Sequence, residues 1–429
     1  MIAAVGLVGL FALLLIGVPI GIGMGIVGFL GFGTIVAMKP AAAMLGNITY
    51  ETAMNYNLSV IPMFVLMGNL VSHSRLASEM YDASNALFGR FKGGLAMATI
   101  GACAIFSAVC GSSVATASTM SKVAVPSMRR YNYSDRLATG AVAAGGTLGM
   151  LIPPSVVMVL YGIMTQTSIA KLFIAGVLPG LLGVICYLGA VRYAVWRRPE
   201  EGPAADPMTR AEVLTALRGG AGVTVLLVVV IGGIYAGVFT PSEAAGVGAF
   251  VAFLLALVKR SLTWRGTYDI LVDSAKTTAT LFIILIGATL FANFLDVAGL
   301  PTALRDVLTG LGLNRYVLLA AILLIYLVLG CFLESISMIL LTLPIFFPIV
   351  MSLGFDPIWF GVILIVVTEI SMITPPIGMN VFVLNVVLRD VSLQTIFRGV
   401  TPFIVADVLR VLILVAVPWI VLILPSLMG

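Results

Sequence analysis

The chain has 429 residues, of which 61% are hydrophobic and only 10% are charged. Soluble domains carry about 25% charged residues, so this composition excludes a soluble protein. A bilayer crossing takes ~20 apolar helical residues, and the apolar sequence leaves room for about a dozen crossings. Stretches such as 223–230 and 322–329 are apolar on every face, which excludes the alternating strands of a membrane barrel. We therefore predict an all-α polytopic membrane protein.

The charged and reactive residues exclude several functions. The net charge of +5 does not indicate a nucleic-acid partner, because Lys and Arg lie in short loops between apolar segments. The four cysteines lie in apolar segments without CxxC spacing, which indicates small apolar side chains rather than a metal site or disulfides. The sequence has neither HExxH nor a Walker A loop, and its single histidine has no catalytic serine partner. We therefore expect neither an intramembrane hydrolase nor an ATP-driven pump, and no enzyme at all.

The first segment, 1–56, is predicted to be an N-terminal scaffold that remains in the membrane. Its apolar part is too long for a cleaved signal peptide. Gly17 and Pro19 interrupt it, so it forms either one long span or two short ones. A polar loop at 197–218, placed in the cytoplasm by the positive-inside rule, opens a middle section, 197–276, with two ordinary scaffold spans.

Two related units flank this middle section, at 57–196 and 277–429. Sliding the chain along itself gives collinear matches: Ser113 with Ser335, Met150 with Met372, Pro153 and Pro154 with Pro375 and Pro376, and Pro179 with Pro402. Counting spans from the cytoplasmic loop puts the basic residues around 94–128 inside and those around 316–352 outside. The two units are therefore predicted to be inverted repeats.

Each unit contains a pair of half-length apolar segments joined by small polar residues. The pairs are 94–128, with Gly111 and Ser113 at its tip, and 316–352, with Glu334 and Ser335 at its tip. Two ordinary helices with a tight turn would fit this pattern. A tip of small hydroxyl residues favours a re-entrant hairpin that stops inside the protein.

Each hairpin precedes a helix that a Pro-Pro pair interrupts, at 136–165 and 357–388. Because proline has no N–H, these pairs release the carbonyls of Gly149, Met150, Ser371 and Met372. A simple kink is the alternative. Carbonyl and hydroxyl oxygens suit Na⁺, so we expect Ser112, Ser113 and Thr116 to meet 149–154. Gly330 and Ser335 are expected to meet 371–377.

Ionisable residues inside apolar stretches are costly and need a reason. Glu334 and Glu369 either bind a cation, carry a proton or are structural carboxylates. Lys122 either reaches the interface or pairs within its hairpin, or it contacts an anionic substrate. Three further interpretations concern structure: an internal ion pair of Asp407 with Arg410, a helix cap at Glu243, and an interfacial position for His73.

Five motifs give the chain a resemblance to a known family. They are GSSVATAS at 111–118, GMLIPPS at 149–155, GIYAGVFTPSEAAGVGA at 233–249, FLESISMILLTLPIFFPI at 332–349 and TEISMITPPIGMNVFV at 368–383. The chain resembles, over essentially its whole length, the large membrane (DctM-like) subunit of tripartite ATP-independent periplasmic (TRAP) transporters. One position departs from the pattern, since Ser371 stands where the family usually has glycine.

The resemblance implies a Na⁺-driven, elevator-type importer of an organic acid such as a C4-dicarboxylate or sialic acid, in the bacterial inner membrane. It implies two partners, a small four-span (DctQ-like) subunit and a periplasmic binding protein (DctP-like), and no cofactor besides the coupling Na⁺. A stand-alone symporter and proton coupling through Glu334 and Glu369 remain alternatives. The cation-binding candidates are Ser112, Ser113, Thr116, Gly149, Ile152, Pro154, Gly330, Ser335, Ser371, Thr374 and Ile377. The substrate-binding candidates are Ser113, Thr147, Ser155, Glu334 and Asn380.

Overall fold

The computed structural model describes residues 2–206, 208–310 and 313–428 of the chain. Over these residues the chain forms α-helices, joined by short loops and three 3-10 turns, without any strand. The prediction of an all-α protein is therefore confirmed.

The N-terminal segment forms two short helices rather than one long span, α1 (Ile2–Leu15) and α2 (Ile20–Ile35). Between them Gly17 has a φ of +86°, a conformation that favours glycine, and Pro19 is the N-cap of α2. These two residues break the helix. After α2, helix α3 (Met38–Met54) leads through the 3-10 turn η1 (Tyr56–Ser59) into α4 (Val60–Ser72), with a bend of 57°.

Helix α13 (Trp264–Val297) packs along α2 at very short range. A Cβ on Gly21 would lie 2.8 Å from the Cα of Ile284, so only glycine fits there. Gly28 faces the backbone of α13 in the same way. The predicted boundary between 276 and 277 falls inside α13, which is continuous over 34 residues.

The three helices directly before α13 are α10 (Ile169–Arg197), α11 (Arg210–Tyr235) and α12 (Pro241–Val258). The short turn η3 (Pro199–Glu201) follows α10. The predicted polar loop at 197–218 was too long. The hydroxyl of Thr209 accepts the N–H of Glu212, whose carboxylate accepts the N–H of Thr209, and this capping box starts α11. Thr240 and Glu243 start α12 with the same motif, which confirms Glu243 as a cap residue.

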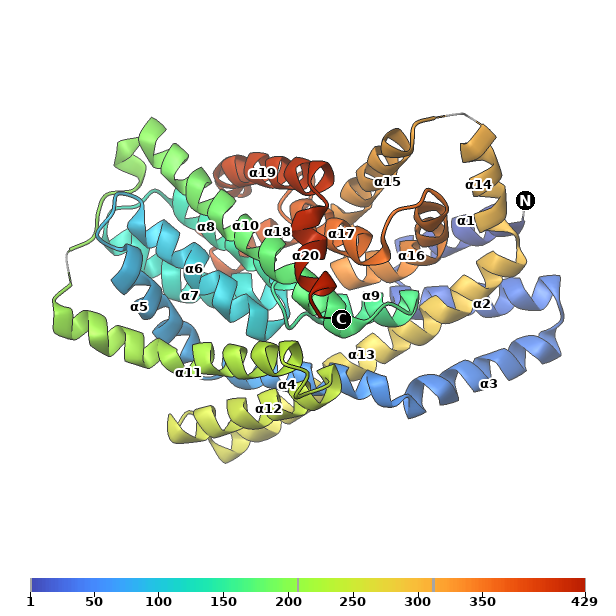
Figure 1. The fold of residues 1–429 in the computed structure, drawn as a ribbon, viewed down its shortest axis with the longest axis horizontal. Coiled ribbons are helices and arrows are strands. Elements are labelled where there is room, and N and C mark those ends of the chain that lie inside the picture. The colour runs from blue at the N-terminus through green and yellow to red at the C-terminus, as the bar shows by residue number, and fades with distance from the viewer. Residues whose placement is uncertain (1, 207, 311–312, 429) are drawn as a thin grey trace.

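The remaining helices include the two helix pairs predicted as hairpins and the helices that flank the two Pro-Pro interruptions. In the first unit they are α5 (Leu76–Phe88), α6 (Gly94–Cys110), α7 (Ser113–Arg130), α8 (Asp135–Thr147), the turn η2 (Leu148–Met150) and α9 (Val156–Thr165). In the second unit they are α14 (Leu300–Gly310), α15 (Arg315–Gly330), α16 (Ser335–Ser352), α17 (Pro357–Ser371), α18 (Met379–Val387), α19 (Leu393–Ala416) and α20 (Trp419–Ser426). Figure 1 shows α6–α8 on the left, α14–α16 on the right, and α10, α17 and α20 between them.

Six helices of the described chain are long and apolar enough to cross a membrane: α10, α11, α12, α13, α16 and α19. The bent pair of α3 and α4 would make a seventh span. Composition alone left room for about a dozen crossings. The number of full-length spans is lower because other apolar helices, including α6, α9 and α17, have only 10–17 residues. The fold is that of a multi-pass membrane protein whose two units combine long spanning helices with shorter apolar ones.

Candidate substrate and cation site

Both hairpins turn at polar residues that start the second helix of each pair. α6 ends at Cys110, Gly111 adopts a φ of +65°, and the hydroxyl of Ser112 accepts the N–H of Ala115 at 3.3 Å. In the second hairpin, a carboxylate oxygen of Glu334 accepts the N–H of Ser337 at 3.1 Å. Each tip therefore presents a helix N-terminus together with a hydroxyl or carboxylate oxygen.

The two Pro-Pro pairs lie where the helices are interrupted. α8 ends at Thr147, and α9 starts at Val156 after Ser155, whose hydroxyl accepts the N–H of Met158. α17 ends at Ser371, and α18 starts at Met379 after Gly378, which has a φ of +57°. Residues 151–155 and 372–378 thus leave the helical path, as predicted.

We expected four bare carbonyls, but three of them, those of Met150, Ser371 and Met372, accept hydrogen bonds. Ser155 Oγ donates to the carbonyl of Met150 at 2.6 Å. The N–H groups of Thr374 and Asn380 donate to the carbonyls of Ser371 and Met372 at 3.3 and 3.1 Å. Ser155 and Asn380, which follow the prolines, supply two of these donors, and Thr374, directly before Pro375, supplies the third. Each carbonyl oxygen has two lone pairs, so one hydrogen bond leaves a second for a cation.

The first hairpin packs against α8 and η2, but the side chain of Ser113 reaches the other interrupted helix. Ser113 Oγ donates to Asn380 Oδ1 at 2.8 Å, and Asn380 Nδ2 donates to the carbonyl of Ala143 at 3.0 Å. Asn380 lies on α18, so the first tip binds to the second interrupted helix. It is Ser107 on α6 that faces Gly149, where a Cβ would overlap it. Sequence alone did not predict this crossing because it depends on how α7 packs against α18.

The second hairpin meets the second interrupted helix, as expected. Gly330 faces Ser371 so closely that a Cβ on Gly330 would overlap the Ser371 hydroxyl. Ser335 Oγ lies 2.9 Å from Met372 Sδ, and Ser113 Oγ from the other hairpin lies 3.4 Å from the same sulfur. Met372 is therefore the point at which both tips meet.

A cavity of about 820 Å³ opens in front of the two tips. Residues of both hairpin tips line one side, together with Met150 and Met372 of the interrupted helices. The opposite wall consists of residues from the start of α2, from α4 and from α13. Lys276 and Glu334 are the charged side chains that line this cavity in the described chain.

The cavity receives some of the predicted site residues and not others. Those that line it are Ser112, Ser113, Glu334 and Ser335. Thr147, Ser155 and Asn380 are fully buried behind it, with their side chains hydrogen-bonded to other parts of the protein.

The other cation-binding candidates lie within the tips and the interruptions. The hydroxyls of Ser371 and Thr374 donate to the carbonyls of Thr368 and Ile370, and the N–H of Ile152 donates to the carbonyl of Leu148. Thr116 is different, because its hydroxyl is fully buried and has no hydrogen-bond partner among the described residues. Such an oxygen is open to a ligand.

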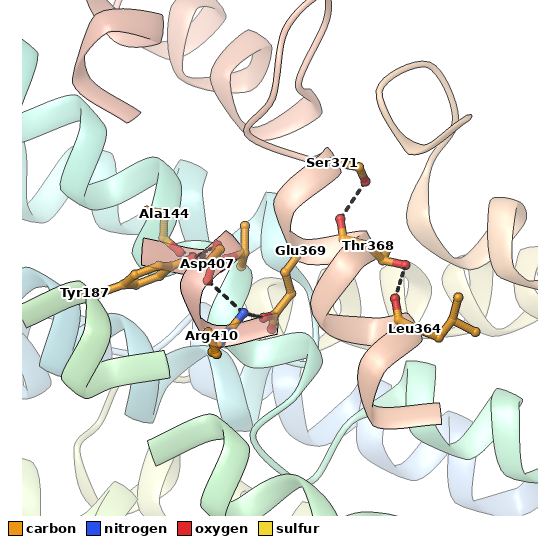
Figure 2. A network of polar contacts seen from close by, with 9 residues as sticks. Ala144, Tyr187, Leu364, Thr368, Glu369, Ser371, Asp407 and Arg410 are labelled. Atoms are coloured by element: carbon orange, nitrogen blue, oxygen red, sulfur yellow. Dashed lines mark hydrogen bonds and ion pairs between the residues drawn. The ribbon is translucent and has the colours of Figure 1, made fainter. Parts of the chain in front are cut away.

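A buried polar network runs behind the cavity, and Figure 2 shows its centre. Arg410 of α19 is fully buried and forms ion pairs with Glu369 of α17 and, at 2.9 Å, with Asp407. The predicted pair of Asp407 and Arg410 is confirmed, and Glu369 is a paired carboxylate. Tyr187 on α10 donates to Asp407 at 2.5 Å, and its hydroxyl also lies 3.2 Å from Thr147 Oγ1 at the end of α8. The network thus connects both interrupted helices.

Sequence reasoning missed two residues of these sites. Tyr187 gave no signal, because a tyrosine in an apolar helix is usually a packing residue. Lys276 was not among the predicted site residues, but it lies within α13 and lines the cavity. Thr277 and Thr280 on the same helix also line it. The polar residues Lys276, Thr277 and Thr280 within an apolar helix could have indicated a site in the sequence. Lys122 is exposed on α7 and is not among the residues that line the cavity.

Two helical hairpins that meet two interrupted helices around one cavity, in an all-α membrane protein, are typical of a secondary transporter. The chain belongs to the family described as "Tripartite ATP-independent periplasmic transporter, DctM component", which matches residues 7–420. It is therefore a transporter permease subunit and not an enzyme.

Two relatives and one solved structure illustrate the match. The C4-dicarboxylate TRAP transporter large permease protein DctM of Pseudomonas aeruginosa is 39% identical, with 94% of each chain covered. The sialic acid TRAP transporter large permease protein SiaM of Vibrio cholerae is 36% identical, over 90% of this chain and 89% of that one. The crystal structure of the Alcanivorax borkumensis YdaH transporter has a TM-score of 0.60 at 16% identity, covering 88% of each chain, and so shares the fold alone.

Proposed function

We propose that this chain is the large permease subunit of a Na⁺-coupled secondary importer of small organic acids in the bacterial inner membrane. The observation that carries the proposal is the cavity of about 820 Å³ between the two hairpin tips and the wall formed by α2, α4 and α13. Its volume is within the range of sites that hold a small molecule. Hydroxyl groups of Ser112, Ser113 and Ser335 lie on one side of it and a lysine on the other.

The substrate class follows from this chemistry together with the relatives. The two relatives are named for C4-dicarboxylates and sialic acid, which are both carboxylates. Hydroxyl donors, helix N-termini and a lysine are groups that bind a carboxylate. A small organic acid is therefore the class that the cavity fits best.

Na⁺ as the coupling ion is supported by the oxygens around the interruptions. Within residues 2–206, 208–310 and 313–428, no group of three or more His, Cys, Asp or Glu side chains is arranged to hold a metal. Hydroxyls and carbonyls remain, and these are ligands for a hard monovalent cation. At the first hairpin Ser112 and Thr116 would contribute, and at the second Ser335, with carbonyls from 371–377. Glu369 pairs with Arg410 and Glu334 caps α16, which leaves both less suited to carry a proton.

The elevator mechanism is supported by how the cavity is enclosed. The α2–α13 pair is packed backbone to backbone through glycines and suits a rigid wall. The hairpins and interrupted helices are held together by the Ser113–Asn380 bond and the buried network, and suit a body that moves as a unit. The small four-span subunit would enlarge the fixed wall, and a periplasmic binding protein would deliver the acid.

The direct test is uptake by reconstituted protein. The large subunit, the small subunit and the binding protein encoded with them are placed in liposomes, and uptake of radiolabelled succinate and N-acetylneuraminate is measured. We expect uptake with an inward Na⁺ gradient and none with a proton gradient alone. Uptake driven by a proton gradient without Na⁺ would show that the coupling ion is the proton and not Na⁺. Uptake by the large subunit alone at the rate of the full assembly would indicate a stand-alone symporter.

A matched pair of substitutions tests the first cation site in the same assay. Thr116→Val removes the hydroxyl that has no partner among the described residues. Thr99→Val, on the same hairpin, removes a buried hydroxyl that donates to the carbonyl of Leu95. We expect Thr116→Val to raise the Na⁺ concentration for half-maximal uptake about tenfold, the equivalent of ~1.4 kcal/mol, and Thr99→Val to leave it unchanged. Equal Na⁺ dependence in both variants contradicts a Thr116 ligand.

Inversion of the two units is tested by labelling at matched positions. Arg130 ends α7 and Ser352 ends α16, and both are exposed. A cysteine at Arg130 should react with an impermeant thiol reagent from the cytoplasm only, and one at Ser352 from outside only. Labelling of both from the same side excludes inverted units.

A further inference from the structure

The charge on the cavity wall has an uneven distribution. Two charged residues line the cavity, Glu334 at a hairpin tip and Lys276 on α13. The Glu334 carboxylate is engaged, because it accepts the N–H of Ser337 and lies at the positive end of α16. Lys276 has no ion pair with any carboxylate of the described chain within 4.0 Å. The cavity therefore offers one uncommitted cation, on the wall opposite the tips.

Lys276 also lies between two cavities. A second cavity of about 410 Å³ is lined by His73, by the loop between α12 and α13, and by the first turns of α13. Lys276 is the residue common to this cavity and the large one among the described residues. The second cavity contains the carboxylates of Asp269 and Asp273, whereas the large one contains the hairpin hydroxyls. Lys276 thus lies between the large cavity and the acidic side chains of Asp269 and Asp273, and an anion in the large cavity can reach it.

The neighbours of Lys276 hold its position. Two residues before it, Ser274 is nearly buried and accepts a hydrogen bond from Asn69 of α4 at 2.8 Å, while donating to the carbonyl of Ile270. This contact fixes α13 against α4 at the height of the cavity. Lys276 is exposed to the cavity side, next to Thr277 and Thr280, which also line it. The ammonium group therefore projects from a fixed part of the protein and not from the hairpins.

We propose that Lys276 binds the carboxylate of the transported acid from the fixed wall, while the hairpin tips bind the rest of the molecule. This inference rests on the proposed function and names a residue that determines its anion specificity. Because α13 does not move with the hairpins in that mechanism, the contact exists in one position of the hairpins and is broken in the other. Lys276 therefore favours anion binding in the hairpin position that brings the tips next to α13.

The test is ligand binding to the purified full-length chain, with succinate, fumarate, lactate, gluconate and N-acetylneuraminate as probes at saturating Na⁺. We expect at least one acid to bind the wild type, Lys276→Gln to weaken its affinity about tenfold, and Lys276→Arg to retain it within about threefold. Lys122→Gln, on an exposed lysine of α7 away from the cavity, serves as the matched control and should bind like the wild type.

Charge restoration separates binding from a structural role. In a background without the four native cysteines, Lys276→Cys is treated with a methanethiosulfonate that adds either an ammonium or a sulfonate. The ammonium adduct should recover affinity and the sulfonate adduct should not. If the wild type binds and Lys276→Gln binds equally well, the Lys276 inference is wrong while the proposed function stands. Binding of no acid by the wild type overturns both, and equal recovery by both adducts overturns the role of the charge.

Discussion

The two interrupted helices reach the protein interior at matching positions with different chemistry. The sequence matches that relate the two units place Thr147 on Glu369 and Tyr187 on Arg410. In the first unit the pair is two neutral hydroxyls 3.2 Å apart, and in the second it is a buried ion pair. The first pair is worth little net free energy, about 0.5–1.5 kcal/mol, and each of its hydroxyls also donates to a second partner, the Ala144 carbonyl or the Asp407 carboxylate. In the second pair both partners are required, because removing one would leave a buried charge without a counter-ion and destabilise the fold.

The two pairs are also joined to each other. Tyr187 of the first unit donates to Asp407 of the second, which pairs with Arg410 (Figure 2). A Cβ on Gly183 of α10 would overlap the Arg410 guanidinium, so this glycine provides the space for it. The two units therefore contribute different groups to one network. The second unit supplies the charged side chains, and the first supplies two hydroxyls and, at Gly183, the space for the Arg410 guanidinium.

The largest effect is expected from Arg410→Leu. It leaves Glu369 and Asp407 buried without a counter-ion, a loss of about 3–5 kcal/mol. The thermal unfolding midpoint of the purified chain should fall sharply, and expression with it. The control is the combined variant Arg410→Leu, Glu369→Leu, Asp407→Asn, in which no charge remains and much of the stability should return. A single variant as stable as the combined one would contradict the account of the ion pair.

The next effect concerns the bridge between the units. Tyr187→Phe removes one hydrogen bond to a carboxylate and one hydroxyl contact, at a cost of about 1.5–3 kcal/mol. Thr147→Val removes two neutral hydrogen bonds, one with Tyr187 and one to the carbonyl of Ala144, and should cost less because neither involves a carboxylate. The unfolding midpoints of the two variants and of the double variant form a mutant cycle. Equal losses in the two single variants would show that Asp407 does not depend on Tyr187.

A smaller effect distinguishes the packing of the two hairpins. In the first unit the glycine is on the interrupted helix and faces Ser107, and in the second it is on the hairpin and faces Ser371. Gly149→Ala should therefore overpack the contact and cost about 1–3 kcal/mol. Replacing Ser107 by glycine in the same variant should restore little of this stability, because the added Cβ would also lie 2.4 Å from the backbone oxygen of Ser107. Full recovery in the double variant would mean that the Ser107 side chain alone limits the space at Gly149.

The smallest effect is expected at the position that departs from the family pattern. Ser371→Gly removes a hydroxyl that donates within its own helix, and Gly330 leaves space around it. We expect a loss of less than about 1 kcal/mol and unchanged Na⁺ dependence of uptake. A large change in Na⁺ dependence would instead make the Ser371 hydroxyl a cation ligand.

The local features of the sites were predictable from sequence, and the contacts between distant elements were not. The Pro-Pro pairs and the small polar tips located the interruptions and the hairpins, because these residues act on their own backbone. The capping motif of Thr209 also acts locally, but it lies within the polar stretch 197–218, where charged residues indicated a loop.

The partners of Ser113, Glu369 and Lys276 depend on packing between segments far apart in the chain. Ser113 binds Asn380, Glu369 pairs with Arg410, and Lys276 lines a cavity with both hairpins. No periodicity in one helix specifies which neighbour it will meet, so the hydrogen bonds behind the tips could not be assigned. The residues of the tips themselves, Ser112, Ser113, Glu334 and Ser335, were predicted as site residues and do line the cavity.

The central claim is that the hairpins move against the wall of α2 and α13 while carrying the acid. Ile336 and Ile283 line the cavity from its two sides and are the pair to test. With cysteines at both positions in a background without native cysteines, a bifunctional methanethiosulfonate should abolish uptake by the reconstituted assembly, and dithiothreitol should restore it. Each single cysteine should transport normally after the same treatment. Full uptake by the crosslinked protein would contradict movement of the hairpins against this wall.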